Sequence, residues 1–316
     1  MAKKFKYVTT AITATAALTA AASEGLFYLM SSRGGNPDLI TGVKEEDKTD
    51  LDKAIEKVRD EDYRWLLDRE LETYYITSKD GLRLRATLLR AKEETNRYVF
   101  CIHGYRNTGF REFDSISRFY HGLGINVFII DQRACGESDG KFITYGYKEC
   151  DDCIEWLKFM RKEFGENTEI ILHGVSMGAA TVMLMTGRML PNNIVFAVED
   201  CGYSSLKGQL YHTFSNYHLP AALAYGLFRV SSRLHCDFDP NDCNPIEGVE
   251  QSNIPILFVH GEEDDFVPFE MVYANYDACP SPVKKLITVP GAKHGQAFEA
   301  DSQVRDEIKK MIETYL

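Results

Sequence analysis

The sequence predicts an α/β fold, with a mostly parallel central sheet, helices on both faces and a short helical cap. Three observations lead to this class. From residue 97 onward, short apolar runs alternate with stretches of helical spacing, which is the pattern of parallel strands joined by crossover helices. The long segment 203–250 interrupts this alternation. The pentapeptide Gly174-Val175-Ser176-Met177-Gly178 stands between an expected strand and an expected helix.

The expected elements follow one another in a regular order. Residues 51–71 have helical spacing, and a hairpin follows around Asp80-Gly81, with strands at 73–78 and 82–90. Segment 203–250 is too long for a simple crossover, so we expect a helical insertion over the carboxyl ends of the strands, where ligands bind in such sheets. The remaining strands are expected at 98–102, 126–130, 169–173, 194–199, 255–259 and 285–289, and the helices at 110–123, 147–164, 179–185, 269–278 and 304–316.

Composition narrows the classes of partner. The 316 residues suffice for one large domain or two smaller ones. The net charge of −11 argues against a nucleic-acid partner, which needs a basic surface. No zinc motif occurs, and segment 237–241 only begins like a calcium loop, because Asp242 replaces the required Gly. We expect neither a metal nor a cofactor, and the oligomeric state stays open.

The cysteines give no clear site. Cys150 and Cys153 form a C-x-x-C inside a helix-like stretch, whereas a redox motif needs a helix N-terminus. Cys236 and Cys243 flank a loop and can form a disulfide if the protein is exported. We therefore assign no cysteine to the chemistry.

The pentapeptide at 174–178 matches the Gly-x-Ser-x-Gly nucleophile elbow. A strand that turns at once into a helix forces Ser176 into a strained backbone conformation and holds its hydroxyl out of the turn. Gly174 and Gly178 lack a Cβ and so let the strand and the helix pass closely. The N–H groups at the start of the helix point at an anion forming beside Ser176. Ser176 is therefore the predicted nucleophile.

A serine nucleophile needs a base, and the base needs an acid that orients it. In proteins with this elbow the chain order is Ser, then Asp or Glu, then His. If the acid follows the strand at 255–259, His294 is the only later histidine, in a loop just past the last strand. The acid stays open on this reasoning, because loop 261–268 offers four carboxylates and Asp200 follows an earlier strand.

Three other histidines are assigned structural positions. His103 and His260 each end an expected strand and precede a glycine, which favours a structural role. His173 directly precedes the pentapeptide at 174–178, and we expect its side chain to face away from the site.

Residues 260–268 resemble the His-Gly-x-x-Asp-x-x-Val-Pro segment of the α/β-hydrolase family. This resemblance implies that Asp264, and not Asp265, is the triad acid. His103-Gly104-Tyr105 resembles the oxyanion loop of the family, which implies that the Tyr105 N–H pairs with the Met177 N–H. Residues 131–138 are similar to the Asp-x-Arg-Gly-x-Gly-x-Ser loop of the family, with Ala134 in place of the first Gly. The resemblance runs from about residue 74 to the C-terminus and favours a bacterial, serine aminopeptidase-like branch with an N-terminal anchor.

The resemblance implies a serine hydrolase that works by acyl transfer. His294 takes the proton of Ser176, and Asp264 holds the imidazole. We interpret the chain as a carboxylic-ester hydrolase for small-molecule substrates with an apolar acyl part. A peptidase or amidase uses the same triad but needs a charged anchor in the cap, where Arg229 and Arg233 are available although surface roles suit both better. A catalytically silent binding module is the alternative from another class.

The N-terminus has the pattern of a targeting segment. Three lysines within residues 3–6 precede an apolar run at 7–22, which ends in the small residues Ala20-Ala21-Ala22. We expect residues 1–32 to be a signal peptide or a retained membrane anchor, with the catalytic domain outside the cytoplasm. Their removal should then leave a soluble, active enzyme. Residues 33–71 are expected to form a linker and a helix, and residues 72–316 the hydrolase domain.

Overall fold

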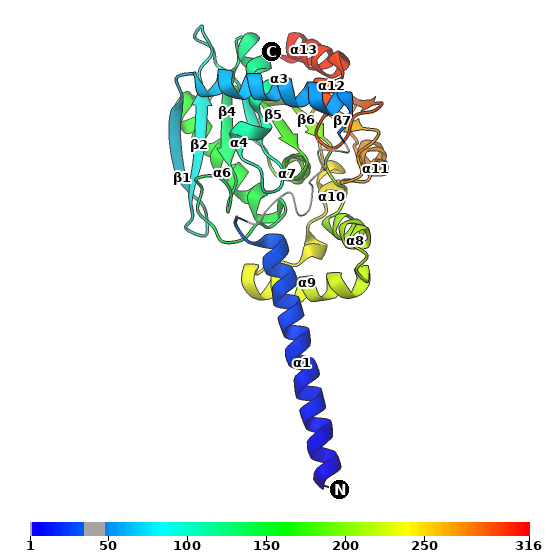
Figure 1. The fold of residues 1–316 in the computed structure, drawn as a ribbon. Coiled ribbons are helices and arrows are strands. Elements are labelled where there is room, and N and C mark those ends of the chain that lie inside the picture. Colours follow the sequence, from blue (N-terminus) through cyan, green and yellow to red (C-terminus); the bar gives the residue numbers. More distant parts are fainter. Residues whose placement is uncertain (1, 35–47) are drawn as a thin grey trace.

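The computed structural model describes residues 2–34 and 48–316, and an eight-stranded sheet is its centre. The strand order is β1-β2-β4-β3-β5-β6-β7-β8 (Figure 1). The first two strands form an antiparallel hairpin, β2 pairs antiparallel with β4, and all later pairs are parallel. The predicted mostly parallel sheet is therefore confirmed. The strands are β1 Glu72–Thr77, β2 Arg83–Leu89, β3 Arg97–Ile102, β4 Asn126–Asp131, β5 Glu169–Val175, β6 Ile194–Asp200, β7 Ile256–Gly261 and β8 Lys284–Val289.

Burial along the strands follows their place in the sheet. Every residue of β4 and β7 is buried, because parallel strands are covered on both faces. The edge strand β1 instead alternates half-buried and exposed residues. Apolar runs without alternation therefore belong to the interior strands, and the alternating run belongs to the edge.

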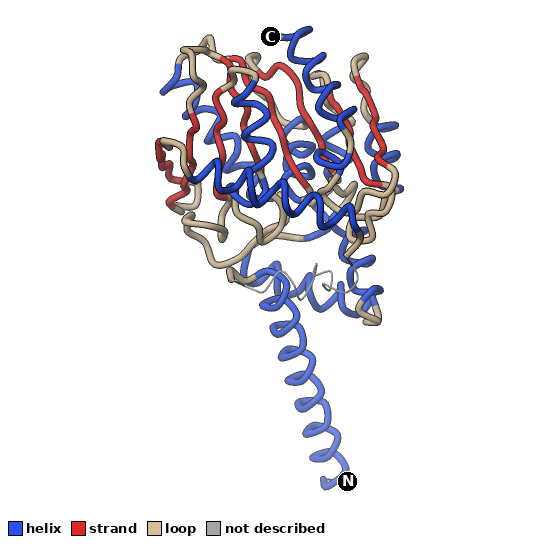
Figure 2. Tube along the Cα trace, turned by 45° about the horizontal axis from the view of Figure 1, so that its top comes forward, coloured by secondary structure: helices blue, strands red, loops and turns tan. Residues whose placement is uncertain are grey.

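Helices cover both faces of the sheet (Figure 2). One apolar cluster joins a sheet face to α3, α5, α12 and α13. A second cluster joins the other face to α6, α7 and α11, with Trp156 fully buried at its centre. The helix expected at 110–123 is broken at the buried Phe113, where the ring turns into the core. The helices are α3 Asp50–Leu67, α4 Gly109–Glu112, α5 Asp114–Gly122, α6 Tyr147–Phe164, α7 Met177–Thr186, α11 Glu270–Ala278, α12 Ala297–Ala300 and α13 Ser302–Tyr315.

The expected helical insertion is present between β6 and β7. Its elements form a third apolar cluster, which lies outside the two layers and includes Met177 of α7 (Figure 1). Together they make a cap beside the carboxyl end of β5. The cap consists of α8 Leu206–Asn216, α9 Ala221–Cys236, the short 3₁₀ helix η2 Pro240–Asp242 and α10 Pro245–Val249.

The first helix, α1 Ala2–Ser31, extends away from the body and reaches the cap only with its C-terminal end (Figure 1). There Ser23 Oγ donates to the Leu227 carbonyl of α9 at 2.6 Å, and Glu24 contacts His235 at 2.6 Å. Phe27 is only 1% exposed. The C-terminal end of α1 is therefore packed on the cap, and the activity of the enzyme without residues 1–32 stays a prediction.

A helix that crosses a membrane needs about 20 mostly apolar residues. No helix within the described residues 2–34 and 48–316 combines the length and the apolar character that crossing a bilayer requires.

The eight cysteines are buried and free in the structure. Burial raises the pKa of Cys150 to about 12 and that of Cys153 well above its ordinary value. Both thiols therefore stay protonated at neutral pH and pack as small apolar groups. Cys236 and Cys243 are not joined by a disulfide.

Candidate active site

Ser176 lies at the junction of β5 and α7 in a strained conformation, with φ 56° and ψ −118°. Its N–H donates to the Asp200 carbonyl at 2.8 Å, which ties the turn to the end of β6. The flanking glycines are required by space. A Cβ on Gly174 would lie 2.3 Å from the Gly178 carbonyl oxygen, and one on Gly178 would lie 1.8 Å from the Ile102 carbonyl oxygen. The strand–turn–helix geometry predicted from the pentapeptide is therefore present.

This close approach predicts a large loss of stability in Gly178→Ala. Backbone of β3 occupies the space that the new methyl group needs, so strand and helix must separate. We expect the free energy of unfolding, measured by urea titration, to fall by about 3 kcal/mol or more. Gly226→Ala is the matched control, because Gly226 is exposed in α9 with nothing within 4 Å of an added Cβ. That variant should gain up to about 1 kcal/mol. Equal midpoints for the two variants would contradict the argument.

Three side chains from separate loops meet at the elbow. His294 Nε2 lies 2.8 Å from Ser176 Oγ, and His294 Nδ1 lies 2.7 Å from Asp264 Oδ2. The loops follow β5, β7 and β8, which end at the same edge of the sheet. The structure thus brings together the three residues proposed from the sequence in one hydrogen-bonded chain.

Asp264 is held by four hydrogen bonds. Its Oδ1 accepts from the N–H groups of Phe266 at 3.0 Å and Val267 at 2.9 Å, and its Oδ2 is contacted by both His294 and His260. Burial by itself raises the pKa of the Asp264 carboxyl. The charge of His294 and the hydrogen bonds from the two histidines outweigh burial and hold this pKa well below its usual range.

The pKa of His294 moves in the opposite direction. Burial by itself lowers it, because an apolar environment disfavours the imidazolium. The charge and the hydrogen bond of Asp264 outweigh burial, and Glu112 and Asp200 add to this effect, so the pKa of His294 is raised. His294 is therefore more basic than an isolated histidine.

His260 has a supporting position that the sequence reasoning did not assign. The ring is fully buried at the end of β7, and its Nε2 lies 3.1 Å from Asp264 Oδ2 and 3.2 Å from the Val267 carbonyl oxygen. It therefore contacts the same carboxylate oxygen as His294 and helps to hold the Asp264 side chain. The sequence analysis gave His260 only a general structural role, and the spacing of four residues between His260 and Asp264 is the one sequence feature that relates the two.

The remaining candidates lie elsewhere. His173 packs below the sheet with its Nδ1 3.1 Å from the Tyr120 hydroxyl, and burial lowers its pKa to about 3. His103 Nε2 accepts from the Gln132 N–H at 3.0 Å. Asp200 is buried, which raises its pKa to about 7, and no hydrogen bond among the described residues joins its carboxyl to His294. The competing acid is thus close to the base without contacting it.

The loop His103-Gly104-Tyr105 passes directly beside the nucleophile. A Cβ on Gly104 would lie 3.2 Å from the Cβ of Ser176. The Gly104 N–H is already engaged by Glu112 Oε2 at 3.1 Å, so it is not available to a substrate. Tyr105 is the next donor along the loop, and Met177 is the first residue of α7, where an N–H has no partner within the helix.

Two cavities of different character meet at Ser176. One, of about 350 Å³, is polar and is lined by Arg59, Glu112 and Lys293 together with His294. The other, of about 30 Å³, lies under the cap and presents an apolar surface. The site is therefore a polar entrance joined to a small apolar chamber.

One group of potential metal ligands overlaps the triad. Cys201, Asp264 and His294 each place a ligand atom within 4.8 Å of the others. Burial raises the pKa of the Cys201 thiol well above its ordinary value, whereas a metal needs the thiolate. Asp264 and His294 are already bonded to each other, so we assign this group to hydrogen bonding.

Helix α3 holds the loop that carries His294. Asp52 Oδ2 lies 2.7 Å from Lys293 Nζ, and Asp52 Oδ1 accepts from Gln296 Nε2 at 2.7 Å. Arg59 donates to the Gly295 carbonyl and forms an ion pair of 2.8 Å with Glu299. The residues before and after the base are thus fixed from the opposite end of the chain, which no local pattern in the sequence indicated.

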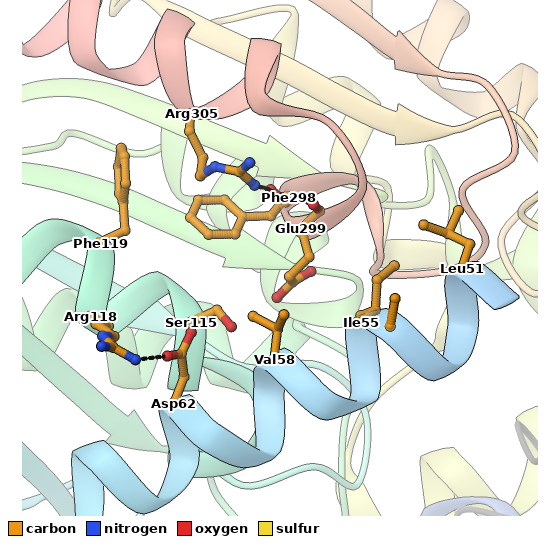
Figure 3. A pocket seen from close by; sticks show the side chains of 11 residues that line it. Leu51, Ile55, Val58, Asp62, Ser115, Arg118, Phe119, Phe298, Glu299 and Arg305 are labelled. Atoms are coloured by element: carbon orange, nitrogen blue, oxygen red, sulfur yellow. Dashed lines mark hydrogen bonds and ion pairs between the residues drawn. The ribbon is translucent and has the colours of Figure 1, made fainter.

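A further cavity, of about 480 Å³, is separate from this site. It lies between α3, α5, α12 and α13, with the Arg118–Asp62 ion pair on one side and Phe298 on another (Figure 3). None of Ser176, Asp264 and His294 lines it. Its size alone therefore does not connect it with the reaction.

Comparison with known proteins places the chain in a family. The model of the Prolyl oligopeptidase family matches residues 111–313. The chain belongs to this family. The matched segment of the prolyl oligopeptidase family contains Ser176, Asp264 and His294, whereas the loop 103–105, α1 and α3 lie before it.

The relatives that the chain matches by sequence are distant from it. The uncharacterized protein YqkD of Bacillus subtilis is 25% identical over 248 residues, which are 78% of this chain and 79% of YqkD. The uncharacterized membrane protein YNL320W of Saccharomyces cerevisiae is 22% identical over 230 residues, which are 73% of this chain and 75% of the yeast protein.

Solved structures agree on the fold. The Pyrococcus furiosus esterase Pf2001 superimposes with a TM-score of 0.64 at 23% identity, covering 79% of this chain and 93% of the esterase. Est1E from Butyrivibrio proteoclasticus, with ferulic acid bound, gives a TM-score of 0.59 at 21% identity, covering 77% and 98%. The α/β-hydrolase fold is thereby confirmed, and with the prolyl oligopeptidase family match the chain is a serine hydrolase. The serine aminopeptidase-like branch stays a prediction.

Proposed function

We propose that the protein hydrolyses carboxylic esters through Ser176, His294 and Asp264. The observation that carries this proposal is the continuous hydrogen-bonded chain from Ser176 Oγ through both nitrogens of His294 to Asp264 Oδ2, with distances of 2.8 and 2.7 Å. A hydroxyl becomes a useful nucleophile only when a base accepts its proton as it attacks.

The reaction has two halves. Ser176 Oγ attacks the ester carbonyl carbon while its proton passes to His294 Nε2, and the C–O bond to the alcohol then breaks as His294 returns the proton to the leaving oxygen. Water next attacks the acyl-enzyme while His294 again accepts a proton. The carboxylic acid then leaves as His294 returns the proton to Ser176 Oγ. Asp264 holds Nδ1–H throughout and stabilises the imidazolium that forms twice.

The negative charge on the carbonyl oxygen needs its own stabilisation. We assign this role to the backbone N–H groups of Tyr105 and Met177. Support comes from the passage of the 103–105 loop beside Ser176 and from the position of Met177 at the start of α7. Each such donor contributes roughly 3 kcal/mol to transition-state stabilisation in other serine hydrolases.

The two arginines of the cap that were considered as anchors for a peptide carboxylate are already paired, and this favours an ester over a peptide as the substrate. Arg229 binds Asp239 in a bidentate pair at 2.7 and 2.7 Å, and Arg233 contacts the same carboxylate. Both guanidinium groups are therefore engaged and cannot capture a peptide carboxylate without losing these bonds. The small apolar chamber beside Ser176 suits an acyl chain.

The peptidase alternative has its own support. The family takes its name from an oligopeptidase, and Glu112 in the polar cavity supplies a carboxylate that can bind an amine. A panel of p-nitrophenyl esters and aminoacyl-p-nitroanilides separates the two activities. We expect kcat/KM for the esters to exceed that for the anilides by at least about 10³-fold. At about 1.4 kcal/mol per tenfold step, this ratio corresponds to about 4 kcal/mol. The reverse order would assign the protein as a peptidase.

The location of the protein stays a proposal. The positive residues and apolar run of residues 1–22 support export or attachment to a membrane, and the yeast relative is described as a membrane protein. A leader cleaved after Ala22 would leave Ser23 and the rest of the packed end of α1 in place.

The raised pKa of His294 predicts the pH dependence of the reaction. The base must be neutral to accept the proton of Ser176, so activity is lost as pH falls through this pKa. Because the pKa is raised, the acidic limb of kcat/KM should lie above about pH 6.5, the ordinary value for histidine. Residual activity of Asp264→Asn should show the limb at lower pH, whereas Asp265→Asn should leave it in place. A wild-type limb at or below pH 6.5 would refute this assignment.

A further inference from the structure

The C-terminal end of α1 is bonded to the walls of the active site. The last four carbonyls of a helix have no partner within the helix. In α1 the carbonyls of Leu29, Met30 and Ser31 find their partners in the catalytic part of the molecule. The Met30 carbonyl accepts from the hydroxyls of both Tyr105 and Tyr145, the latter at 2.6 Å, and the Ser31 carbonyl accepts from the Ile143 N–H at 2.8 Å. The end of α1 is thus fixed in the site at consecutive residues.

Arg106 adds a charged contact at the same place. Its Nη2 donates to the carbonyls of Leu29 and Ser32, where a cation is favoured by the helix dipole. Arg106 directly follows Tyr105, so two consecutive residues of the oxyanion loop bind the end of α1. The rings of Tyr105 and Tyr145 stack with centroids 5.6 Å apart. Met30 therefore has a defined position relative to Ser176.

Met30 also lines the apolar chamber beside the nucleophile. It is 6% exposed, and it shares the lining of the 30 Å³ cavity with Tyr145 and with Leu206 and Leu210 of α8. One water-sized group needs about 10–15 Å³ of such a cavity. The chamber therefore takes about two groups of methylene size beyond the carbonyl carbon that Ser176 attacks.

We propose that Met30 sets the length of the acyl chain, and that the substrates are esters of short-chain carboxylic acids with about two to four carbons. This inference rests on the ester hydrolysis proposed above. It makes the end of α1 a specificity-determining part of the enzyme, although α1 begins in a segment that has the pattern of a leader. Removing the Met30 side chain beyond Cβ opens space for a longer acyl chain without touching the triad.

The test uses the full chain and p-nitrophenyl acetate, butyrate and octanoate. A methylene that a hydrophobic pocket cannot accommodate costs about 10–200-fold in kcat/KM. We expect wild type to prefer butyrate over octanoate by at least about 10-fold. In Met30→Ala the octanoate-to-butyrate ratio of kcat/KM should rise by at least about 10-fold. A merely structural role for Met30 would lower activity on all three esters together and leave the ratio unchanged.

Two controls bracket this result. Leu29→Ala removes a side chain of similar size that is 52% exposed on the same helix and should keep the wild-type ratio. Met30→Leu conserves volume and should keep it as well. If Met30→Ala does not fold, Met30→Val gives a smaller change in the same direction.

The outcomes separate the two proposals. If wild type hydrolyses none of the esters, the proposed function fails and this inference fails with it. If wild type hydrolyses octanoate as well as butyrate, or if the ratio is the same in wild type and in the shortened Met30 variants, ester hydrolysis stands and only the role of Met30 is overturned.

Discussion

Ser176→Ala should abolish turnover and labelling by a fluorophosphonate probe. The probe forms a covalent bond only with a serine hydroxyl that a neighbouring base activates, and His294 Nε2 lies 2.8 Å from this one. Loss of the nucleophile costs roughly 10⁶-fold in kcat in a well-studied serine hydrolase. Gel fluorescence after labelling and ester hydrolysis at saturating substrate measure the two effects.

We expect the Ser176→Ala variant to fold as the wild type does. Alanine keeps the Cβ of serine, so it meets the same backbone strain at φ 56° that serine already tolerates. Ser215→Ala, at an exposed site on α8, is the matched control and should label as wild type. Undiminished labelling of a folded Ser176→Ala protein would show that another residue is the nucleophile.

Asp264→Asn should lower kcat by roughly 10³–10⁴-fold with little change in KM. The Asn oxygen can still accept from the N–H groups of Phe266 and Val267, which leaves the NH₂ group facing His294 Nδ1. The imidazole must then accept at Nδ1 and carry its proton on Nε2, which is the wrong tautomer for a base toward Ser176. Steady-state kinetics on the best ester give both constants.

Two neighbouring carboxylates serve as controls for this variant. Asp265→Asn changes the exposed adjacent residue and should cost far less. Asp200→Asn removes a buried carboxyl that has no hydrogen bond to His294 among the described residues, so it too should keep most of the turnover. If Asp200→Asn abolished turnover while Asp264→Asn stayed near wild type, the acid would belong to β6.

The sequence sufficed for the features that depend on local pattern. Continuous apolar runs predicted the buried strands, and the spacing of Gly174 and Gly178 around Ser176 predicted the elbow, because a close passage of strand and helix admits only glycine there. The order Ser, Asp, His along the chain reduced the choice of base to His294. Each of these inferences uses residues that lie close together in the sequence or a fixed order of loops.

Features that depend on distant contacts could not be predicted in this way. The burial of Phe27 and Met30 depends on α9 and on two tyrosines far along the chain. In the sequence alone, the apolar end of a helix that packs on the protein cannot be told from the apolar part of a leader. His260 supports Asp264 only because the loop after β7 folds back onto the strand. Asp52 binds Lys293 and Gln296, one on each side of His294, although these two residues are separated from it by 241 and 244 positions in the sequence.

Two contacts described above have one property in common. Helix α3 binds the loop that carries His294, and the end of α1 lines the small apolar chamber beside Ser176. Both helices lie before residue 111, where the match to the family begins. Ser176, Asp264 and His294 lie within the matched segment, whereas Met30, which lines the small chamber beside Ser176, and Asp52, which binds the loop of His294, lie before it. If Met30 sets the acyl length as proposed, similarity over residues 111–313 does not by itself identify the substrate of this chain, because the chamber beside Ser176 is completed by a residue outside that range.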